Sequence, residues 1–295
     1  MQSLESLKRK IGNAEDLESV VRTMKTLAAV SIRQYETAVE SLSDYYATIE
    51  DGLRMVLWQS PEVPRARPPE TGGRTGAILF GSDQGMCGQF NEQVVNHALE
   101  RMPRADDTDN SWAFLAVGVR AASRLEDAGY TVDHDLSVPG SSTGITSRVY
   151  DLLRTIDDWR SQRDLSRIVL FYNRRHTASS YVPHHWQLLP VDVRRFESLK
   201  QRRWQSRTLP TFTMERGQLF SVLIHQYLFV SLFRACAESL SSENASRIAS
   251  MQAAERNIDA RLVELRTDYN QLRQTSITEE LLDVVTGFEA LTKKK

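Results

Sequence analysis

The residues of this chain that could do chemistry are few and far apart. Cys87 stands in a glycine-rich segment before a predicted helix, where the helix N-terminus could lower the pKa of a thiol. A buried, unreactive cysteine is the interpretation that we favour. His184 and His185 are neighbours on a predicted strand, so their side chains point to opposite faces and a shared metal ion is not expected. These residues therefore predict no catalytic constellation, no cofactor site and no metal site.

The glycine-rich segment is the strongest short motif, Gly81-Ser82-Asp83-Gln84-Gly85-Met86-Cys87-Gly88-Gln89-Phe90-Asn91. Glycines between a strand and a helix can form a tight turn whose backbone amides bind phosphate. The spacing here matches neither the dinucleotide-binding nor the P-loop pattern, and the Lys-Ser/Thr pair of a P-loop is missing. We therefore favour a structural turn, in which glycine permits close packing and positive φ angles.

A basic run with two aromatic residues, between Arg194 and Arg207, has the composition of a nucleic-acid site. The whole chain, however, carries 37 Lys and Arg against 38 Asp and Glu, a formal net charge of -1. Such a balance gives no bulk attraction to nucleic acid or to an anionic membrane. We interpret the run as a solvated basic face and expect no nucleic-acid partner.

The cysteines and the ends of the chain bear on its compartment. Only Cys87 and Cys236 are present, which excludes a disulfide framework and favours a reducing compartment. No signal or transit peptide is recognised, and no uninterrupted apolar run approaches the roughly 20 residues that cross a bilayer. Membrane association is therefore expected only through partners.

Proline divides the chain into three parts. All nine prolines lie between Pro61 and Pro210, so both ends lack the residue that most strongly breaks helices. We predict an N-terminal coiled-coil helix over 1–60, an α/β globular domain over 61–210 and a C-terminal coiled-coil helix over 211–295. The alternative is a set of shorter helices with breaks at Gly217 or Ser241-Ser242.

Apolar residues at steps of three and four predict that the two ends pair as a coiled coil. The N-terminal seam is Ile32, Tyr35, Val39, Leu42, Tyr46, Ile49, Leu53 and Val56. The C-terminal seam is Ile248, Met251, Glu255, Ile258, Leu262, Leu265, Tyr269 and Leu272, and it resumes after a shift at Ile277, Leu281, Val284, Phe288 and Leu291. Because a charge in a dry seam is costly, Glu255 is expected to have a polar partner.

The middle alternates strand-like and helix-like runs, which predicts a mostly parallel sheet with helices on its faces. The predicted strands are Ala77 to Phe80, Trp112 to Val117, Tyr130 to Val132, Ile168 to Tyr172 and His185 to Leu189. The predicted helices are Glu92 to Met102, Arg120 to Ala128 and Ser147 to Trp159.

Several motifs then resemble one family, the gamma subunit of F-type rotary ATP synthases. The glycine segment from Ser82 to Asn91 is similar to that family's Ser/Thr-Asp-Arg/Lys-Gly-Leu-Cys-Gly-x-Phe/Tyr-Asn motif. Ser242 to Ala254 and Tyr269 to Leu281 resemble its SExxARxxAMxxA and YNxxRQxxITxEL signatures, and Arg22 to Ala29 resembles its KAMxMVAA. These motifs occur in the family's order.

The resemblance implies a long antiparallel coiled coil of the N- and C-terminal helices and a Rossmann-like α/β domain. It implies a central rotor stalk without an active site, peripheral to the membrane, with alpha and beta subunits, an epsilon subunit and a c-subunit ring as partners. Contact or coupling positions facing the catalytic ring are then expected at Met24, Lys25, Asp83, Cys87, Arg247, Gln274, Thr278 and Glu280. The foot that meets the c ring and epsilon is expected at Phe212, Met214 and Glu215.

The chain also departs from the family pattern. Glu15 to Val21 is more acidic and more apolar than the usual stretch, and Gln84 replaces a basic residue. These departures suggest a divergent, alternative bacterial branch, with sodium as a candidate coupling ion. Because no transit peptide is recognised, we expect a bacterial source and, with the resemblance, a location on the cytoplasmic side of the bacterial inner membrane. Two other classes stay open: a coiled-coil scaffold or tether without an ATPase partner, and an α/β enzyme acting on a nucleotide.

Overall fold

The computed structural model describes residues 3–58, 74–101, 112–163, 165–177, 180–191 and 211–292, with side chains as far as residue 286. Its elements are α1 (Leu4–Ser41), α2 (Ser43–Trp58), β1 (Arg74–Phe80), α3 (Phe90–Leu99), β2 (Trp112–Val117), α4 (Val119–Asp127), β3 (His134–Leu136), α5 (Gly144–Gln162), β4 (Leu165–Arg175), β5 (Tyr181–Leu189) and α7 (Arg216–Thr292). The basic run between Arg194 and Arg207 lies outside the described residues.

The chain forms two compact units. The helix unit comprises Met1–Leu27 and Ile248–Lys295, and the sheet unit comprises Ala28–Arg247. Helices α1 and α7 each contribute residues to both units. The predicted boundaries at 60/61 and 210/211 fall on or beside residues outside the description, so the division into three domains stays a prediction.

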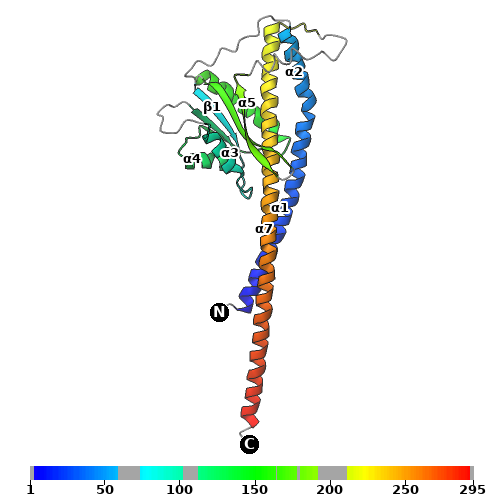
Figure 1. Cartoon of the computed structure of the whole chain (residues 1–295), viewed down its shortest axis with the longest axis vertical. Helices are drawn as coiled ribbons and strands as arrows, with labels where there is room; N and C mark the ends of the chain where they lie inside the picture. The colour runs from blue at the N-terminus through cyan, green and yellow to red at the C-terminus, as the bar shows by residue number, and fades with distance from the viewer. Residues whose placement is uncertain are drawn as a thin grey trace. The chain divides into compact units, whose positions relative to one another are not determined.

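The sheet unit contains a sheet that includes β1 (Figure 1). It has five strands in the order β3-β2-β1-β4-β5. The pairs β1 with β2, β1 with β4 and β2 with β3 are parallel, and only β5 is antiparallel to its neighbour. This topology confirms the predicted mostly parallel sheet. The strands β1, β2 and β4 each contain a continuous buried run, at 76–80, 113–117 and 168–173, because helices cover both faces of the sheet there.

One predicted strand is wrong. The segment Tyr130 to Val132 is not a strand, and β3 begins later, at His134. The reason is the end of α4: Gly129 has a positive φ of 88°, and the Tyr130 amide donates to the Leu125 carbonyl, 3.1 Å away. These bonds are those of a helix C-cap, so Tyr130 belongs to the end of the helix and not to the sheet.

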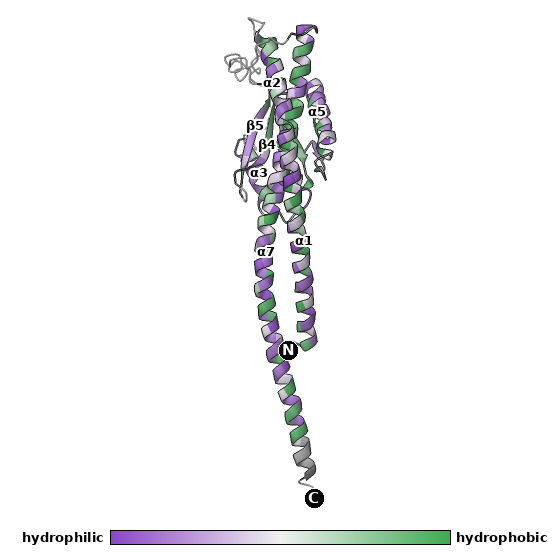
Figure 2. Cartoon of the chain, turned by 90° about the vertical axis from the view of Figure 1, so that its right-hand side faces the viewer, coloured by the Kyte–Doolittle hydropathy of each residue, from purple (hydrophilic) through white to green (hydrophobic). Residues whose placement is uncertain are grey.

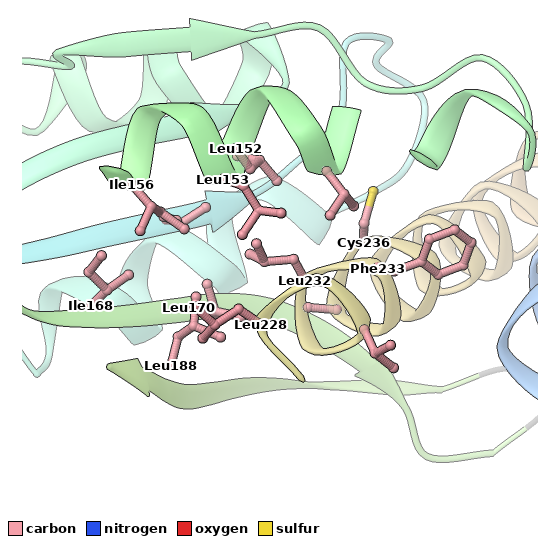
Figure 3. Packing of buried hydrophobic residues seen from close by; sticks show 14 of the residues in the cluster. Leu152, Leu153, Ile156, Ile168, Leu170, Leu188, Leu228, Leu232, Phe233 and Cys236 are labelled. Atoms are coloured by element: carbon pink, nitrogen blue, oxygen red, sulfur yellow. The ribbon is translucent and has the colours of Figure 1, made fainter. Parts of the chain in front are cut away.

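Helices cover both faces of the sheet. Helices α3 and α4 pack on one face through Val94, Val95, Ala98, Ala121 and Leu125, against Ala77, Leu79, Phe114, Val169 and Phe171. On the other face, Figure 3 shows Leu152, Leu153 and Ile156 of α5 directed toward Leu228 and Leu232 of α7, above Ile168 and Leu170 of β4. The α7 helix is therefore part of the hydrophobic core of the sheet unit.

Helix α7 is continuous from Arg216 to Thr292, so the alternative of several shorter helices is wrong. Gly217 is only the second residue of the helix, so it does not interrupt it. At the other predicted break, the Ser242 hydroxyl donates a hydrogen bond to the Glu238 carbonyl one turn earlier, at 2.8 Å, and the helix continues. The N-terminal helix is the one with an interruption. It is divided at Leu42, although the Tyr46 amide still donates to the Leu42 carbonyl at 2.8 Å.

The N-terminal seam is confirmed within the sheet unit, because each of its eight residues is buried or half-buried. In the helix unit, α1 and α7 lie side by side (Figure 1, Figure 2). Lys25 of α1 pairs with Glu255 of α7, and Glu15, ten residues earlier in α1, pairs with Arg266, eleven residues later in α7. The two helices are therefore antiparallel.

The C-terminal seam is confirmed only in its first register. Met251, Leu262 and Leu265 are buried, and the other predicted positions from Ile248 to Leu272 are half-buried. In the second register, Ile277, Leu281 and Val284 are 51%, 61% and 72% exposed. The predicted seam thus loses its intramolecular partner after Leu272, and an apolar surface on α7 stays uncovered by the described residues.

Helix α7 also contains a stretch whose composition and length would suffice to cross a membrane, with a mean hydropathy of 1.5 over 18 residues. The search for uninterrupted apolar runs missed it because polar residues are interspersed. Tyr227, Leu228, Val230 and Leu232 of this region are buried in the core of the sheet unit. Packing on the sheet therefore accounts for the buried part of this stretch, which is 39% of it.

Candidate functional site

The glycine segment forms a tight turn between β1 and α3. Gly81 lies against α4, and a Cβ placed there would be 2.4 Å from the Ala121 Cβ. Gly88 and Met86 have positive φ angles of 56° and 60°. Gly81 thus serves close packing and Gly88 the left-handed backbone, which supports the structural interpretation of the motif.

Asp83 fastens this turn to two other loops. Its Oδ1 accepts a hydrogen bond from the Val119 amide, 3.1 Å away at the start of α4, and its Oδ2 accepts one from the Val138 amide, at 2.9 Å. Both carboxylate oxygens are therefore used inside the sheet unit. Asp83 holds the edge where parallel strands end, and it does not present a free carboxylate to a partner.

Cys87 is 2% exposed and lies inside the turn. Its Sγ is 3.5 Å from the Ser82 Oγ and 3.6 Å from the Asn91 Nδ2. Burial raises the pKa of the Cys87 thiol, and the hydrogen bond to Ser82 offsets only part of that effect. The raised thiol pKa argues against an activated thiolate. The predicted burial of Cys87 is confirmed, and its lack of reactivity stays a prediction.

The turn also contacts α7 directly. The Ser246 hydroxyl donates to the Cys87 carbonyl at 2.5 Å and lies 3.3 Å from the Tyr181 Oη of β5. On the other side of the turn, the buried Asn173 Nδ2 donates to the Phe90 carbonyl at 2.9 Å. The turn, the sheet edge and α7 therefore form one hydrogen-bonded cluster, which we call the clasp: Ser82, Asp83, Cys87, Asn91, Asn173, Tyr181 and Ser246.

Arg247 lies one residue beyond the clasp and forms a buried ion pair with Glu243. Its Nη2 is 2.5 Å from the Glu243 Oε1, and the two side chains are 12% and 7% exposed. Burial raises the pKa of the Glu243 carboxyl, while the Arg247 guanidinium lowers it in part. An ion pair so well buried within one helix fixes both side chains, which limits how far Arg247 can extend toward another protein.

The helix unit contains the predicted partner of Glu255. The Lys25 Nζ is 2.5 Å from the Glu255 Oε2, and the Arg22 Nε is 3.2 Å from its Oε1. Hydrogen bonds from Lys25, and then from Arg22, lower the pKa of the Glu255 carboxyl. The seam thus contains a charge cluster here, and Met24 beside it is half-buried.

The remaining predicted ring contacts are on the exposed part of α7. Gln274, Thr278 and Glu280 are all exposed, and the Thr278 hydroxyl donates to the Gln274 carbonyl at 2.9 Å. That bond is local to the helix. These side chains form no interaction with α1 in the structure, so they stay available to a partner.

The predicted foot precedes α7 in the sheet unit. Glu215 caps the helix, because its carboxylate accepts hydrogen bonds from the Gly217 and Gln218 amides, both at 2.9 Å. These bonds lower the pKa of Glu215. Phe212 is half-buried and Met214 is 49% exposed.

A metal site does not form in the described parts of the chain, where no three of the His, Cys, Asp and Glu residues gather around a common point. His184 and His185 do face opposite sides of the sheet: His184 packs edge-on against Tyr172, and His185 stacks on Phe171. His185 instead meets His97, with 3.3 Å between ring nitrogens. Two imidazoles beside Arg101 are a poor cation site.

Sequence reasoning missed Ser246, which joins the turn to α7, and Glu243, which forms the buried ion pair within α7. Both stand in the segment that resembles the family signature, yet no spacing rule assigns Ser246 a contact with Cys87 or Glu243 a buried ion pair. Their only local signal is polar side chains at positions where a core-facing helix should be apolar. Asn173 gives the same signal within an otherwise apolar strand.

Fold and clasp together define a class of protein: an α/β domain clamped onto the longer of two antiparallel helices, with no catalytic centre among the described residues. A family model described as ATP synthase matches residues 3–291. This chain is 28% identical to the ATP synthase gamma chain of Syntrophus aciditrophicus and 27% identical to that of Paracoccus denitrificans. Each comparison covers 99% of this chain and 100% of the relative. The rotor of the Euglena gracilis mitochondrial ATP synthase matches in structure with a TM-score of 0.65 and 16% identity, over 93% of this chain and 98% of that one.

The chain belongs to the gamma-subunit family of F-type ATP synthases. It is accordingly a non-catalytic, central-stalk component of a membrane-bound complex. The scaffold and nucleotide-enzyme interpretations of the sequence are superseded by this assignment.

Proposed function

We propose that this chain is the turning axle that couples ion flow through a c-subunit ring to ATP synthesis or hydrolysis in a ring of alpha and beta subunits. One observation carries the proposal: the apolar seam of α7 is buried or half-buried as far as Leu272 and exposed at Ile277, Leu281 and Val284. A sustained apolar stripe without an intramolecular partner marks a surface that another protein covers. A sleeve formed by the alpha and beta subunits is the cover that the family assignment supplies.

The mechanism follows from asymmetry. A shaft of two helices in one part and of one helix in another cannot contact each catalytic interface of a pseudo-threefold ring in the same way. Because a rotor angle that contacts the beta states differently shifts their nucleotide affinities, rotation and nucleotide binding are linked. The chain needs no active site for this role.

Two groups of residues take different parts in this proposal. Met24, Lys25, Gln274, Thr278 and Glu280 are the positions from which side chains meet the catalytic ring. Asp83, Cys87 and Arg247 act from inside the protein, because their polar groups are buried or already bonded. In this proposal the Cys87 carbonyl holds the α/β domain on the shaft through Ser246. Asp83 fixes the turn inside that domain, and Arg247 forms an ion pair within α7.

The segment before α7 is proposed as the foot of the stalk. Phe212 and Met214 provide apolar surface to a c-subunit ring and an epsilon subunit, and Glu215 fixes the first turn of the helix beside them. We place the complex at the cytoplasmic side of a bacterial inner membrane. Sodium as coupling ion is tested by ATP hydrolysis of the purified complex with and without sodium, and indifference to sodium would remove that idea.

Co-purification tests the function. An affinity-tagged chain, expressed with the alpha, beta and epsilon subunits of the same genome, is expected to elute with them as one complex with ATPase activity. Recovery of the chain alone would favour a coiled-coil tether, and ATP hydrolysis by the isolated chain would contradict an axle without an active site.

A proline substitution in the seam tests the continuous shaft. Leu265 is 4% exposed in the seam, and proline there breaks the helix at a cost of about 3 kcal/mol or more. Leu265→Pro should prevent assembly of a coupled complex, whereas Val263→Ala, at a 66% exposed position two residues away, should not. Normal ion pumping by the Leu265→Pro complex would refute a continuous shaft.

A further inference from the structure

A cavity of about 270 Å³ opens in the sheet unit between the β4-β5 edge of the sheet and helices α2 and α7. Its lining combines an apolar and aromatic wall with two arginines. The lining residues are Tyr46, Leu170, Tyr172, Arg174, His184, Trp186, Val230, Ser231, Arg234 and Ala235. None of them belongs to the clasp, the foot or the predicted ring contacts.

The two arginines are held in place by a single carboxylate. The Arg234 Nε donates to the Glu238 Oε1 at 2.8 Å, and the Arg174 Nε is 3.6 Å from the Glu238 Oε2. Within the described parts of the chain, the Nη groups of both guanidiniums have no hydrogen-bond or ion-pair partner. Glu238 therefore orients each guanidinium through its Nε and leaves the Nη groups to a ligand. One carboxylate neutralises only one of the two positive charges.

The other polar groups around these arginines suit a ligand with one negative charge. Burial and the charge of Arg174 lower the pKa of His184, so this imidazole is neutral near pH 7 and can donate or accept a hydrogen bond. A neighbouring hollow shares Arg174 and is also lined by Arg175, but its three carboxylates, Glu36, Glu40 and Glu238, outnumber these two cations. An excess of negative charge disfavours an anion there. The cationic cavity is the one of the two that an anion can enter.

We propose that this cavity binds a small organic carboxylate, with its charged end at Arg174 and Arg234 and its apolar body between Tyr46, Trp186 and Val230. Its volume limits the ligand. An apolar cavity of roughly 150 Å³ holds benzene, so a cavity of about 270 Å³ accommodates an aromatic body of one or two rings. Such a ligand would bridge the outer strands of the sheet to α2 and α7. The proposal does not depend on the role of the chain as an axle.

Isothermal titration of the purified full-length chain with naphthoate tests the proposal. Naphthoate should bind saturably and more weakly as salt is added, and naphthamide, the neutral isostere, should bind at least about tenfold less tightly, because charge-assisted hydrogen bonds are about twice as strong as neutral ones. Equal affinity for the two probes, or no saturable binding of naphthoate, would overturn a carboxylate site.

Variants locate the binding. Arg174→Gln with Arg234→Gln should weaken naphthoate at least about tenfold, and Ser231→Trp should block it by filling the cavity without touching either charge. Arg167→Gln, which removes an exposed arginine of β4 that does not line the cavity, should leave the affinity unchanged. Circular dichroism confirms that each variant is folded. If the folded double variant bound naphthoate with unchanged affinity, the ligand would lie elsewhere. The same would follow if Arg167→Gln lost as much affinity as the double variant.

Discussion

Replacing Arg247 by methionine tests the buried ion pair of α7. Methionine keeps much of the aliphatic volume but leaves the Glu243 carboxyl, 7% exposed, without its cation. Breaking a buried ion pair from one side costs about 3 to 5 kcal/mol. Because the Arg247 side chain is still 12% exposed, we expect the lower end, about 3 kcal/mol, for the sheet unit.

The effect should depend on pH with a definite sign. Burial raises the pKa of the Glu243 carboxyl above 4.5, Arg247 lowers it in part, and Asp83 raises it further. A carboxyl whose pKa is raised by folding stabilises the folded state fully below its unfolded-state pKa, and this contribution is lost as pH rises through the folded-state pKa. Without Arg247 that pKa rises further. The deficit of Arg247→Met should therefore be larger at about pH 8 than at about pH 5.

Urea unfolding followed by tryptophan fluorescence measures this, because all five tryptophans lie between Trp58 and Trp204 and report on the sheet unit. The double variant Glu243→Gln/Arg247→Met removes both charges and should recover part of the loss. Arg154→Met, at an exposed position of α5, is the matched control and should change stability by less than about 0.5 kcal/mol. A deficit for Arg247→Met under about 1 kcal/mol, or one that shrinks as pH rises, would refute the reasoning.

Three further predictions concern the turn and the thiols. Neither Cys87 nor Cys236 should react with a thiol reagent in the native chain, because burial raises both thiol pKa values, that of Cys236 to about 12; rapid native labelling would contradict this. Gly81→Ala should destabilise the sheet unit, since the new Cβ would lie 2.4 Å from the Ala121 Cβ, and an unchanged urea midpoint would mean that α4 can shift. Asp83→Ala should lower the free energy of unfolding by about 1 to 3 kcal/mol, because two loop amides lose their acceptor. Asp83→Asn keeps one acceptor oxygen and should lower it less. Equal losses for the two variants in calorimetry would count against that cause.

The helices and most of the sheet could be predicted from the sequence because their signals are local. The strand Trp112–Val117 follows directly from its apolar run, and the first seam of α7 follows from steps of three and four. Where tertiary or capping interactions decide, local patterns failed. The displacement of β3 depends on Gly129 and Tyr130 ending α4, which periodicity does not report.

The same limit applies to the candidate site. Glu255 was predicted to need a partner, because a carboxylate in an apolar seam is costly wherever the partner stands in the sequence. The sequence could not show that Lys25 and Arg22 supply it, since 230 residues separate Lys25 from Glu255. Nor could it show that Cys87 meets Ser246, because that bond joins a loop to a helix 159 residues away.

The clasp gives the glycine motif a mechanical reason. A shaft can transmit force from an α/β domain only if the domain does not slide along the helix that carries it. Apolar packing between the sheet and α7 resists separation but does not specify position along the helix axis. The hydrogen bonds from Ser246 to the Cys87 carbonyl and from Ser239 to the Phe80 carbonyl are directional and buried, so a shift along α7 would leave those groups unsatisfied. The turn therefore fixes the register between domain and helix, which is the property an axle requires.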